Sequence, residues 1–195
     1  MKKLTILIDM DDTIENFCQT LIDILNEKHG LHITIDNVTE WDLSKAFPTL
    51  TKHQIFAPTY TKEFWERVKP LPGAIENVKQ LIDDGHDIVI VTASAPESVP
   101  LKLNHFLFRH FPFIKRTNVI VCSRKQMVRG DVMIDDAPHN LEGGDYIKIM
   151  MSANHNKSYN TDMNGMRRVR NWDEAYQCVR CLSDYLFSDI EELGR

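Results

Sequence analysis

Acidic side chains stand directly after apolar, β-branched segments at two places in the sequence. An apolar segment near the N-terminus runs into Asp9, Asp11 and Asp12, and a later one runs into Asp135 and Asp136. Carboxylates brought together repel one another, so some must be protonated or must share a cation. An oxygen-rich cluster suits Mg²⁺, which binds through one or two carboxylates, water and a substrate phosphate. The acidic residues therefore predict a magnesium site that can receive a phosphate group.

Two further strand ends carry residues that could contact the same phosphate. Thr92 closes the segment 87–92 and Ala93 follows it, while Lys125 comes shortly after the segment 118–122. If these ends meet the acidic clusters, Thr92 and nearby backbone N–H groups can donate to phosphate oxygens, and Lys125 can offset their charge. Each cluster alone has a structural explanation, because acidic residues also end strands and cap helices. The four together, in this order, favour a phosphate site.

The elements that must position these residues alternate along the chain. Continuous β-branched segments are typical of strands buried on both faces, and the segments between them carry apolar residues at helical spacing. This alternation predicts an α/β fold, a Rossmann-like parallel sheet with helices on both faces. Ligands bind beyond the carboxyl ends of such strands, where the polar clusters stand. The expected strands are 4–8, 87–92, 118–122, 131–134 and 146–151, and the expected helices are 14–25, 74–83, 98–111 and 172–187.

Composition narrows the class of protein. With 195 residues and 22.6 kDa, the chain can bury a sizeable core in one principal domain. Its net charge of -5 argues against a polymeric nucleic-acid partner or an anionic membrane, because both require a basic surface. No apolar stretch is long enough to span a bilayer, and the apolar run at the N-terminus is too short for a signal peptide. We therefore expect a cytoplasmic protein. Cys178 and Cys181 form a lone C-x-x-C at helical spacing, which favours packing over zinc binding.

The chemical residues also resemble the motifs of a known superfamily. The string Asp9-Met10-Asp11-Asp12-Thr13 resembles motif I, D-x-D-x-T, of the haloacid dehalogenase (HAD) superfamily, and Thr92, Lys125 and Asp135-Asp136 resemble its motifs II, III and IV. The match covers residues 4–136. Four strings are similar to the 5'(3')-deoxyribonucleotidase branch of that superfamily: Ile8-Asp9-Met10-Asp11, Pro72-Gly73-Ala74, Ile134-Asp135-Asp136 and Ala153-Asn154-His155-Asn156.

The resemblance implies a role for each motif residue in an aspartyl-phosphate mechanism. Asp9 would be the nucleophile, and Asp11 would protonate the leaving oxygen and then deprotonate water. Thr92 and the amide of Ala93 would hold phosphate oxygens, and Lys125 would pair with both Asp9 and the phosphate.

The same resemblance implies how the metal is held. Asp9, the backbone carbonyl of Asp11, and Asp136 would bind Mg²⁺, whereas Asp135 would act indirectly or through water. Asp12 departs from the family pattern because many relatives have glycine there. Its carboxylate must therefore point away from the phosphate or be solvated.

The insertion between the first two motifs implies a cap over the site. We expect a catalytic core of residues 1–14 and 70–195 and a small helical cap of residues 15–69, which would exclude water and supply specificity. Four aromatic residues of the insertion are candidates for a substrate-contacting wall, although aromatic residues at helical spacing are more often part of a core: Phe17, Trp41, Phe64 and Trp65. We interpret His139, His155 and Asn156 as residues that fix loops.

The expected function is a magnesium-dependent phosphomonoesterase that acts on nucleoside monophosphates. A phosphatase for a sugar phosphate or phosphoserine stays open as the nearest alternative, because the sequence of the cap does not separate these substrates. A signalling receiver domain combines similar residue types, but its phosphorylated aspartate lies on a later strand and its lysine follows all the acids. The sequence leaves open a homodimer, the preference for 5' or 3' esters, and ribo against deoxyribo selectivity.

Overall fold

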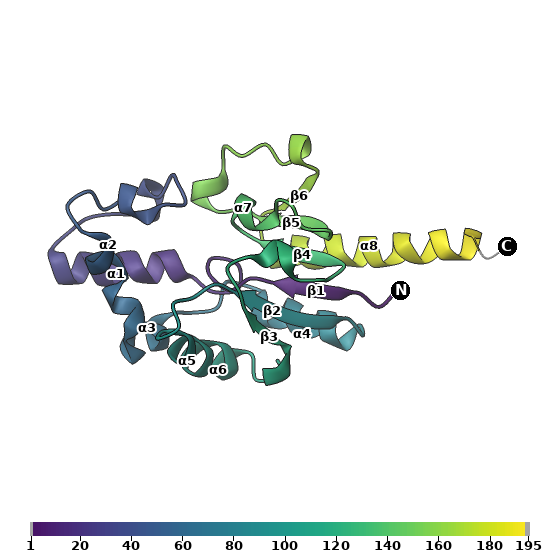
Figure 1. The fold of residues 1–195 in the computed structure, drawn as a ribbon, viewed down its shortest axis with the longest axis horizontal. Coiled ribbons are helices and arrows are strands. Elements are labelled where there is room, and N and C mark those ends of the chain that lie inside the picture. Colours follow the sequence, from purple (N-terminus) through teal and green to yellow (C-terminus); the bar gives the residue numbers. More distant parts are fainter. Residues whose placement is uncertain (1, 194–195) are drawn as a thin grey trace.

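A parallel sheet runs through the middle of the molecule (Figure 1). The computed structural model describes the backbone of residues 2–193 and the side chains of residues 2–185, and within that part the sheet has six strands in the order β3-β2-β1-β4-β5-β6. The chain adds β2 and β3 on one side of β1 and then returns to add β4 on the other side. Ligands of open parallel sheets bind at such a reversal of strand order. The strands are β1 (Thr5–Ile8), β2 (Asp87–Thr92), β3 (Val119–Val121), β4 (Val132–Asp135), β5 (Ile147–Met151) and β6 (Met166–Val169).

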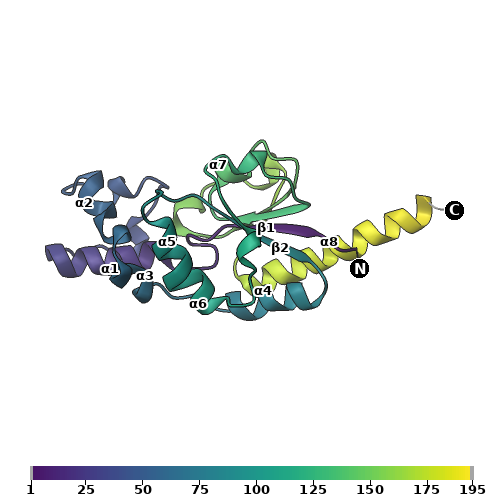
Figure 2. The same ribbon diagram turned by 60° about the horizontal axis from the view of Figure 1, so that its bottom comes forward.

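Successive residues of the central strands point to opposite faces, as the pleat of a strand requires. Ile6 belongs to the large apolar cluster under helices α4 (Ala74–Asp83) and α8 (Trp172–Leu193), while its neighbour Leu7 belongs to a smaller cluster on the other face. Helix α7 (Pro138–Leu141) covers that second face, opposite α4 and α8 (Figure 2). The predicted α/β sheet with helices on both faces is confirmed.

A helical segment between β1 and β2 lies beyond the carboxyl ends of the strands, at the end of the molecule away from both termini (Figure 1). Its three α-helices are α1 (Phe17–His29), α2 (Lys52–Phe56) and α3 (Lys62–Arg67). The two connections to the sheet run side by side, because Asn16 N donates to Lys69 O at 3.0 Å and Lys69 N donates to Asn16 Oδ1 at 2.7 Å. The segment is thus attached to the sheet at one place.

The helix that the sequence predicts over 98–111 is a continuous helical path with an irregular centre. It consists of α5 (Val99–Lys102), a wider π-helical turn (Leu103–Leu107) and α6 (Phe108–His110). Such turns arise where the regular backbone ladder is interrupted, and they are frequent at functional sites. This helix follows β2, so it begins beside the site that the strand ends form.

Several elements differ from the sequence-based expectation, and the helix expected over 14–25 is α1, Phe17–His29. Strand β6 was not predicted, because it is a short edge strand in which Arg167 and Arg168 are adjacent and no alternation marks it. The strand expected over 118–122 is shortened to the edge strand β3, and the closing helix continues past residue 187. Among the described residues, none of the helices combines the length and apolar character that crossing a membrane requires.

Candidate active site

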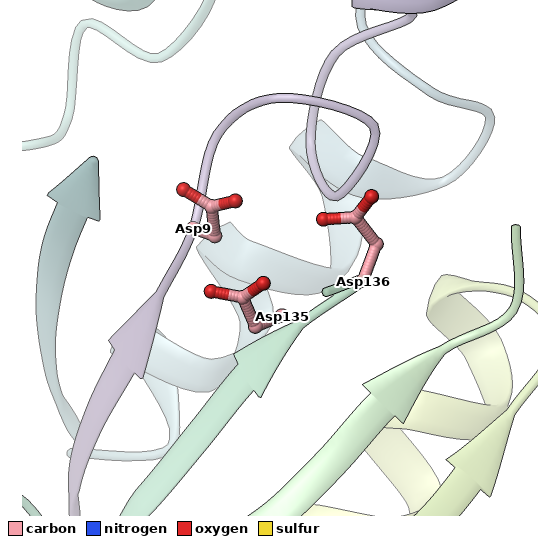
Figure 3. A group of neighbouring side chains, drawn as sticks. All are labelled: Asp9, Asp135 and Asp136. Atoms are coloured by element: carbon pink, nitrogen blue, oxygen red, sulfur yellow. The ribbon is translucent and has the colours of Figure 1, made fainter. Parts of the chain in front are cut away.

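Three aspartates meet where the strand order reverses (Figure 3). Asp9 follows β1, and Asp135 and Asp136 lie at the end of β4, the strand that pairs with β1. Asp9 N donates to Ile134 O at 3.0 Å, which extends the ladder by one step and brings the two strand ends together. One carboxylate oxygen from each aspartate lies within 4.8 Å of the others, and all three residues are at least 94% buried. Parallel pairing of apolar strands therefore forces these charges together.

Lys125 lies between two of these carboxylates. Its Nζ is 2.5 Å from Asp9 Oδ1 and donates to Asp135 Oδ2 at 2.7 Å. The other oxygen of Asp135 accepts from Ala137 N at 2.9 Å and from Asn140 Nδ2 at 3.1 Å. Both oxygens of Asp135 are thus engaged by protein groups, which leaves Asp9 and Asp136 as the aspartates of the trio that border open space.

The charges of Asp9, Asp135 and Lys125 strongly affect one another. Burial, and then the charge of Asp135, raise the pKa of Asp9 well above its usual value, while Lys125 opposes the shift. Burial alone would lower the pKa of Lys125, but Asp9 and Asp135 outweigh it and hold that pKa above its ordinary value. Lys125 is therefore a permanent cation at the centre of the cluster, and it favours the charged form of Asp9 against burial and the neighbouring carboxylates.

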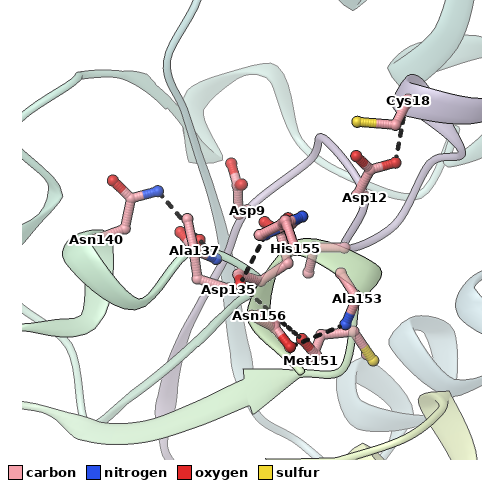
Figure 4. A network of polar contacts seen from close by, with 12 residues as sticks. Asp9, Asp12, Cys18, Asp135, Ala137, Asn140, Met151, Ala153, His155 and Asn156 are labelled. Carbon is pink, nitrogen blue, oxygen red and sulfur yellow. Dashed lines mark hydrogen bonds and ion pairs between the residues drawn. The ribbon is translucent and has the colours of Figure 1, made fainter. Parts of the chain in front are cut away.

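The loop that carries Asp136 is fixed by a second network (Figure 4). Asn156 Nδ2 donates to Asp136 O at 2.7 Å and to Met151 O at 2.8 Å, which ties the end of β4 to the end of β5. His155 Nε2 lies 3.2 Å from Asp136 Oδ2. Burial by itself would lower the pKa of His155, but its hydrogen bond with Asp136 raises that pKa above the ordinary value. Both residues restrict the position of the Asp136 carboxylate.

The donor set fits a small hard cation. Asp9 and Asp136 both border the same cavity and supply only oxygen ligands, the type that Mg²⁺ prefers. Mutual repulsion contributes to the raised pKa of Asp9, and a divalent cation between the two carboxylates would offset it. Asp11, whose backbone carbonyl is the third predicted ligand, also borders this cavity, so the residues predicted to bind the metal surround one space.

A second buried lysine, Lys102, completes the polar site, and the sequence analysis missed it. Lys102 Nζ donates to Asp11 Oδ2 at 2.7 Å and to Thr92 Oγ1 at 2.8 Å. Its position within the predicted helix 98–111 concealed its role. The available signal was its spacing of four residues from the buried Phe106, which places Lys102 on the inward face of that helix.

A cavity of about 540 Å³ opens above these residues. Its floor consists of side chains at the strand ends: Asp9, Asp11, Ala93, Lys125 and Asp136. Its aromatic wall consists of residues from the segment between β1 and β2: Phe17, Trp41, Phe56, Tyr60 and Trp65. Thr92 lies just below the floor, is 1% exposed and reaches the site through its contact with Lys102.

One aromatic residue expected in the wall does not border the cavity. Phe64 is fully buried and packs edge-on against Phe17 and Trp65, at centroid distances of 5.5 Å and 4.9 Å. It supports the wall from behind, because residues 64 and 65 of helix α3 point in different directions and only Trp65 reaches the cavity. Trp65 itself is 1% exposed, and its Nε1 donates to Thr59 O at 2.8 Å.

Asp12, which departs from the family pattern in motif I, borders the same cavity. Its φ of +49° is in the left-handed region, which explains why glycine suits the position. Its Oδ1 accepts from Cys18 N at 3.0 Å, so the carboxylate points at the start of helix α1 (Figure 4). Burial, and then Asp136, raise the pKa of Asp12 to about 7.

Comparisons with known proteins agree on one family. Residues 2–184 match the family model described as 5' nucleotidase, deoxy (pyrimidine), cytosolic type C protein. The chain is 30% identical to the 5'(3')-deoxyribonucleotidase of Bacillus subtilis over 89% of its own length and 96% of the relative's. It is also 30% identical to the 5'(3')-deoxyribonucleotidase of Clostridium acetobutylicum, over 95% of this chain and the whole of the relative.

Solved structures show the same fold at much lower sequence identity. An HAD family hydrolase from Deinococcus radiodurans, with bound phosphate and sodium, aligns with a TM-score of 0.60 at 12% identity, covering 88% of this chain and 92% of the other. A magnesium-bound HAD-type protein from Bacillus subtilis aligns with a TM-score of 0.58 at 16% identity, covering 91% and 99%. The expected HAD-like architecture is confirmed.

Proposed function

This chain belongs to the 5' nucleotidase, deoxy (pyrimidine), cytosolic type C family within the HAD superfamily, and we propose that it hydrolyses nucleoside monophosphates through an aspartyl-phosphate on Asp9. Membership makes it a phosphoric monoester hydrolase and excludes the receiver-domain alternative. The observation that carries the mechanism is the pairing of a buried Asp9 with Lys125 at the reversal point of the sheet, on the floor of an aromatic-lined cavity.

In the first step, a carboxylate oxygen of Asp9 attacks phosphorus and the bond from phosphorus to the ester oxygen breaks. Asp11, two residues further on the same loop, gives its proton to that oxygen, so the nucleoside leaves as a neutral alcohol. Asp11 then takes a proton from water, whose oxygen attacks phosphorus and returns Asp9 as a carboxylate. Lys125 pairs with Asp9 before the attack and faces the phosphoryl charge during it.

We propose Mg²⁺ as the cofactor of this step. Asp9, Asp136 and the backbone carbonyl of Asp11 would hold it, and it would supply positive charge for the phosphoryl oxygens. Asp135 is a poorer ligand, because Lys125 and the groups after β4 already engage both of its oxygens. The magnesium in the Bacillus HAD-type protein supports this choice.

We further propose that residues 15–69 act as a cap that selects the substrate. The floor contacts only phosphate, whereas Phe17, Trp41 and Trp65 line the space that the rest of the substrate would fill. A flat, apolar group such as a nucleobase suits such a wall, because aromatic rings stack on it without a fixed hydrogen-bond pattern. A sugar phosphate, the nearest alternative, would leave this apolar surface without a partner.

The proposal is tested by measuring phosphate release from a panel of substrates in Mg²⁺. The panel holds ribo- and deoxyribonucleoside 5'- and 3'-monophosphates, two sugar phosphates and phosphoserine. We expect kcat/KM for at least one nucleoside monophosphate to exceed that for every sugar phosphate by about a hundredfold or more. Higher values for a sugar phosphate or for phosphoserine would overturn the substrate class and leave the hydrolase assignment in place.

A further inference from the structure

Lys102 is a fully buried lysine with no motif assignment. It ends helix α5, and its side chain is 1% exposed. A buried ammonium group is costly unless charged or polar partners surround it. Burial alone would lower the pKa of Lys102, but Asp11 and then Glu15 outweigh it and raise the pKa above its ordinary value. The ammonium is therefore charged, and its partners define what it does.

The closest partners of Lys102 are two residues of the reaction site. Its Nζ donates to Asp11 Oδ2 at 2.7 Å and to Thr92 Oγ1 at 2.8 Å. An ammonium group can only donate, so the Thr92 hydroxyl accepts this bond and keeps its own hydrogen for another acceptor. Asp11 Oδ2 is occupied in the same way, while Asp11 Oδ1 has no hydrogen-bond partner among the described residues. Oδ1 is also buried, so Lys102 fixes the orientation of the whole carboxylate through its bond to Oδ2.

The remaining contacts of Lys102 lead to the attachment point of the cap segment. Its Nζ is 3.4 Å from Glu15 Oε1 and 5.5 Å from the centroid of the Trp65 ring. Glu15 bridges the loop of Asp11 on one side and Pro70 on the other, where the two connections of the segment run together. Lys102 thus holds Asp11 from a point that is itself fixed by the sheet, the linker and helix α3.

We propose that Lys102 is the positioning residue for the proton-transfer step, aiming Asp11 at the leaving oxygen and orienting the hydroxyl of Thr92 toward the phosphate. This inference rests on the proposed function, in which Asp11 is the acid. The geometry favours a role through Asp11, because the shortest contact of Lys102 is with that carboxylate and the contact with Glu15 is longer. A purely structural lysine, present only to offset the buried Glu15, would affect all substrates equally.

The test therefore uses the leaving group. A nucleoside leaves as a poor alkoxide unless it is protonated, whereas p-nitrophenolate leaves without a proton. The quantity to compare is kcat/KM, because it reports only the steps up to release of the alcohol. We expect Lys102→Met to lower kcat/KM for the best nucleoside monophosphate by about a hundredfold or more, and for p-nitrophenyl phosphate by less than about tenfold.

Two controls separate positioning from loss of structure. Leu107→Ala removes a buried side chain from the same helical path. We expect it to lower kcat/KM for the nucleoside monophosphate and for p-nitrophenyl phosphate by the same factor. Lys102→Met leaves Glu15 buried without its cation, so the double variant Glu15→Gln/Lys102→Met is measured beside it and should show the same dependence on leaving group. Thermal unfolding of each variant confirms that the folded protein is assayed.

Asp11→Asn distinguishes failure of this inference from failure of the proposed function. Suppose that the loss of kcat/KM in Asp11→Asn depends on the leaving group, while both Lys102 variants lower kcat/KM equally for the two substrates. Lys102 is then structural and the inference is wrong. If Asp11→Asn lowers both values equally, Asp11 is not the acid, and the mechanism and the inference fall together. Dependence on the leaving group in all three variants supports the positioning role.

Discussion

The floor of the cavity and its aromatic wall differ in how firmly their side chains are held. On the floor, Asp9 and Lys125 are 4% and 1% exposed and lie 2.5 Å apart, in a network that includes both strands at the reversal point. On the wall, Trp41 and Tyr60 are 64% and 48% exposed, and they come from loops and short helical turns. Rigid placement is what a chemical step requires, whereas a partly exposed wall can admit and release a substrate.

The difference follows from the forces that build each region. Backbone pairing of β1 with β4 brings the floor together, so burial of the strands determines which charges meet. Packing of Phe17, Phe64 and Trp65 against one another builds the wall, and such packing tolerates changes of shape. Substitutions on the floor should therefore impair metal binding or the reaction at phosphorus, and substitutions on the wall should change the order of preference among substrates.

The largest effect is expected at the nucleophile. Asp9→Asn should lower kcat by at least about a thousandfold on every substrate, because an amide does not attack phosphorus. Asp83→Asn, the same change on the exposed face of α4, should leave kcat within about twofold. Rates on p-nitrophenyl phosphate and a nucleoside monophosphate are measured with the unfolding temperature. Activity of Asp9→Asn within tenfold of the wild type would exclude Asp9 as the nucleophile.

The next effect concerns the two neighbouring aspartates of β4. Asp136→Asn should raise the Mg²⁺ concentration for half-maximal rate by about tenfold or more, because it removes a charged ligand. Asp135→Asn should change that concentration less and lower kcat instead, because its oxygens serve Lys125, Ala137 and Asn140. Initial rates are measured during Mg²⁺ titration after treatment with a chelator. A larger shift in Asp135→Asn would reverse the two assignments, and full activity in excess chelator would exclude the metal altogether.

Much of the floor is predictable from the sequence, because parallel strands bring their carboxyl ends to one edge whatever lies between them. Asp9 and Asp136 could be placed together from the order of four apolar segments alone. The same reasoning fails for β6, whose arginines at an edge of the sheet hide the strand pattern. Its four residues place two arginines in a row between two apolar residues, which breaks the period of two that marks a strand with one apolar face.

The choice of aromatic residues that border the cavity, and the role of Lys102, could not be predicted from the sequence for a different reason. Their positions depend on the angle at which helices pack, and a spacing pattern gives only the face of a helix. Phe64 and Trp65 are adjacent in the sequence, yet only Trp65 borders the cavity. Lys102 lies on a buried face where a lysine is uncommon, and only the structure brings Asp11, Glu15 and Thr92 around it.

A smaller effect is expected on the wall itself. Phe17→Leu should lower kcat/KM for a nucleoside monophosphate by about threefold to tenfold, because one aromatic contact is lost. It should change kcat/KM for p-nitrophenyl phosphate less. Phe64→Leu is the matched control, because Phe64 packs behind the same wall without bordering the cavity. We expect Phe64→Leu to lower the unfolding temperature and to leave the ratio of the kcat/KM values for the two substrates unchanged. If Phe17→Leu also leaves that ratio unchanged, Phe17 is a packing residue only.

The smallest effect is expected at Trp41, where the wall meets the floor side of the cavity. Trp41 is 64% exposed and packs edge-on against His139 of helix α7, with ring centroids 4.7 Å apart. Because little of its surface is buried, Trp41→Ala should leave the free energy of unfolding within about 0.5 kcal/mol. KM for a nucleoside monophosphate should rise about threefold with kcat unchanged, since an outer contact contributes to binding rather than to the reacting bonds.

His139→Ala should give a similar rise, and the double variant should add little to either single change if the two rings act as one contact. Met163→Ala, an exposed position outside the cavity, is the control. A fall in kcat for Trp41→Ala as large as that for Asp135→Asn would mean that this edge of the wall takes part in positioning the phosphate, and the division between floor and wall would be wrong.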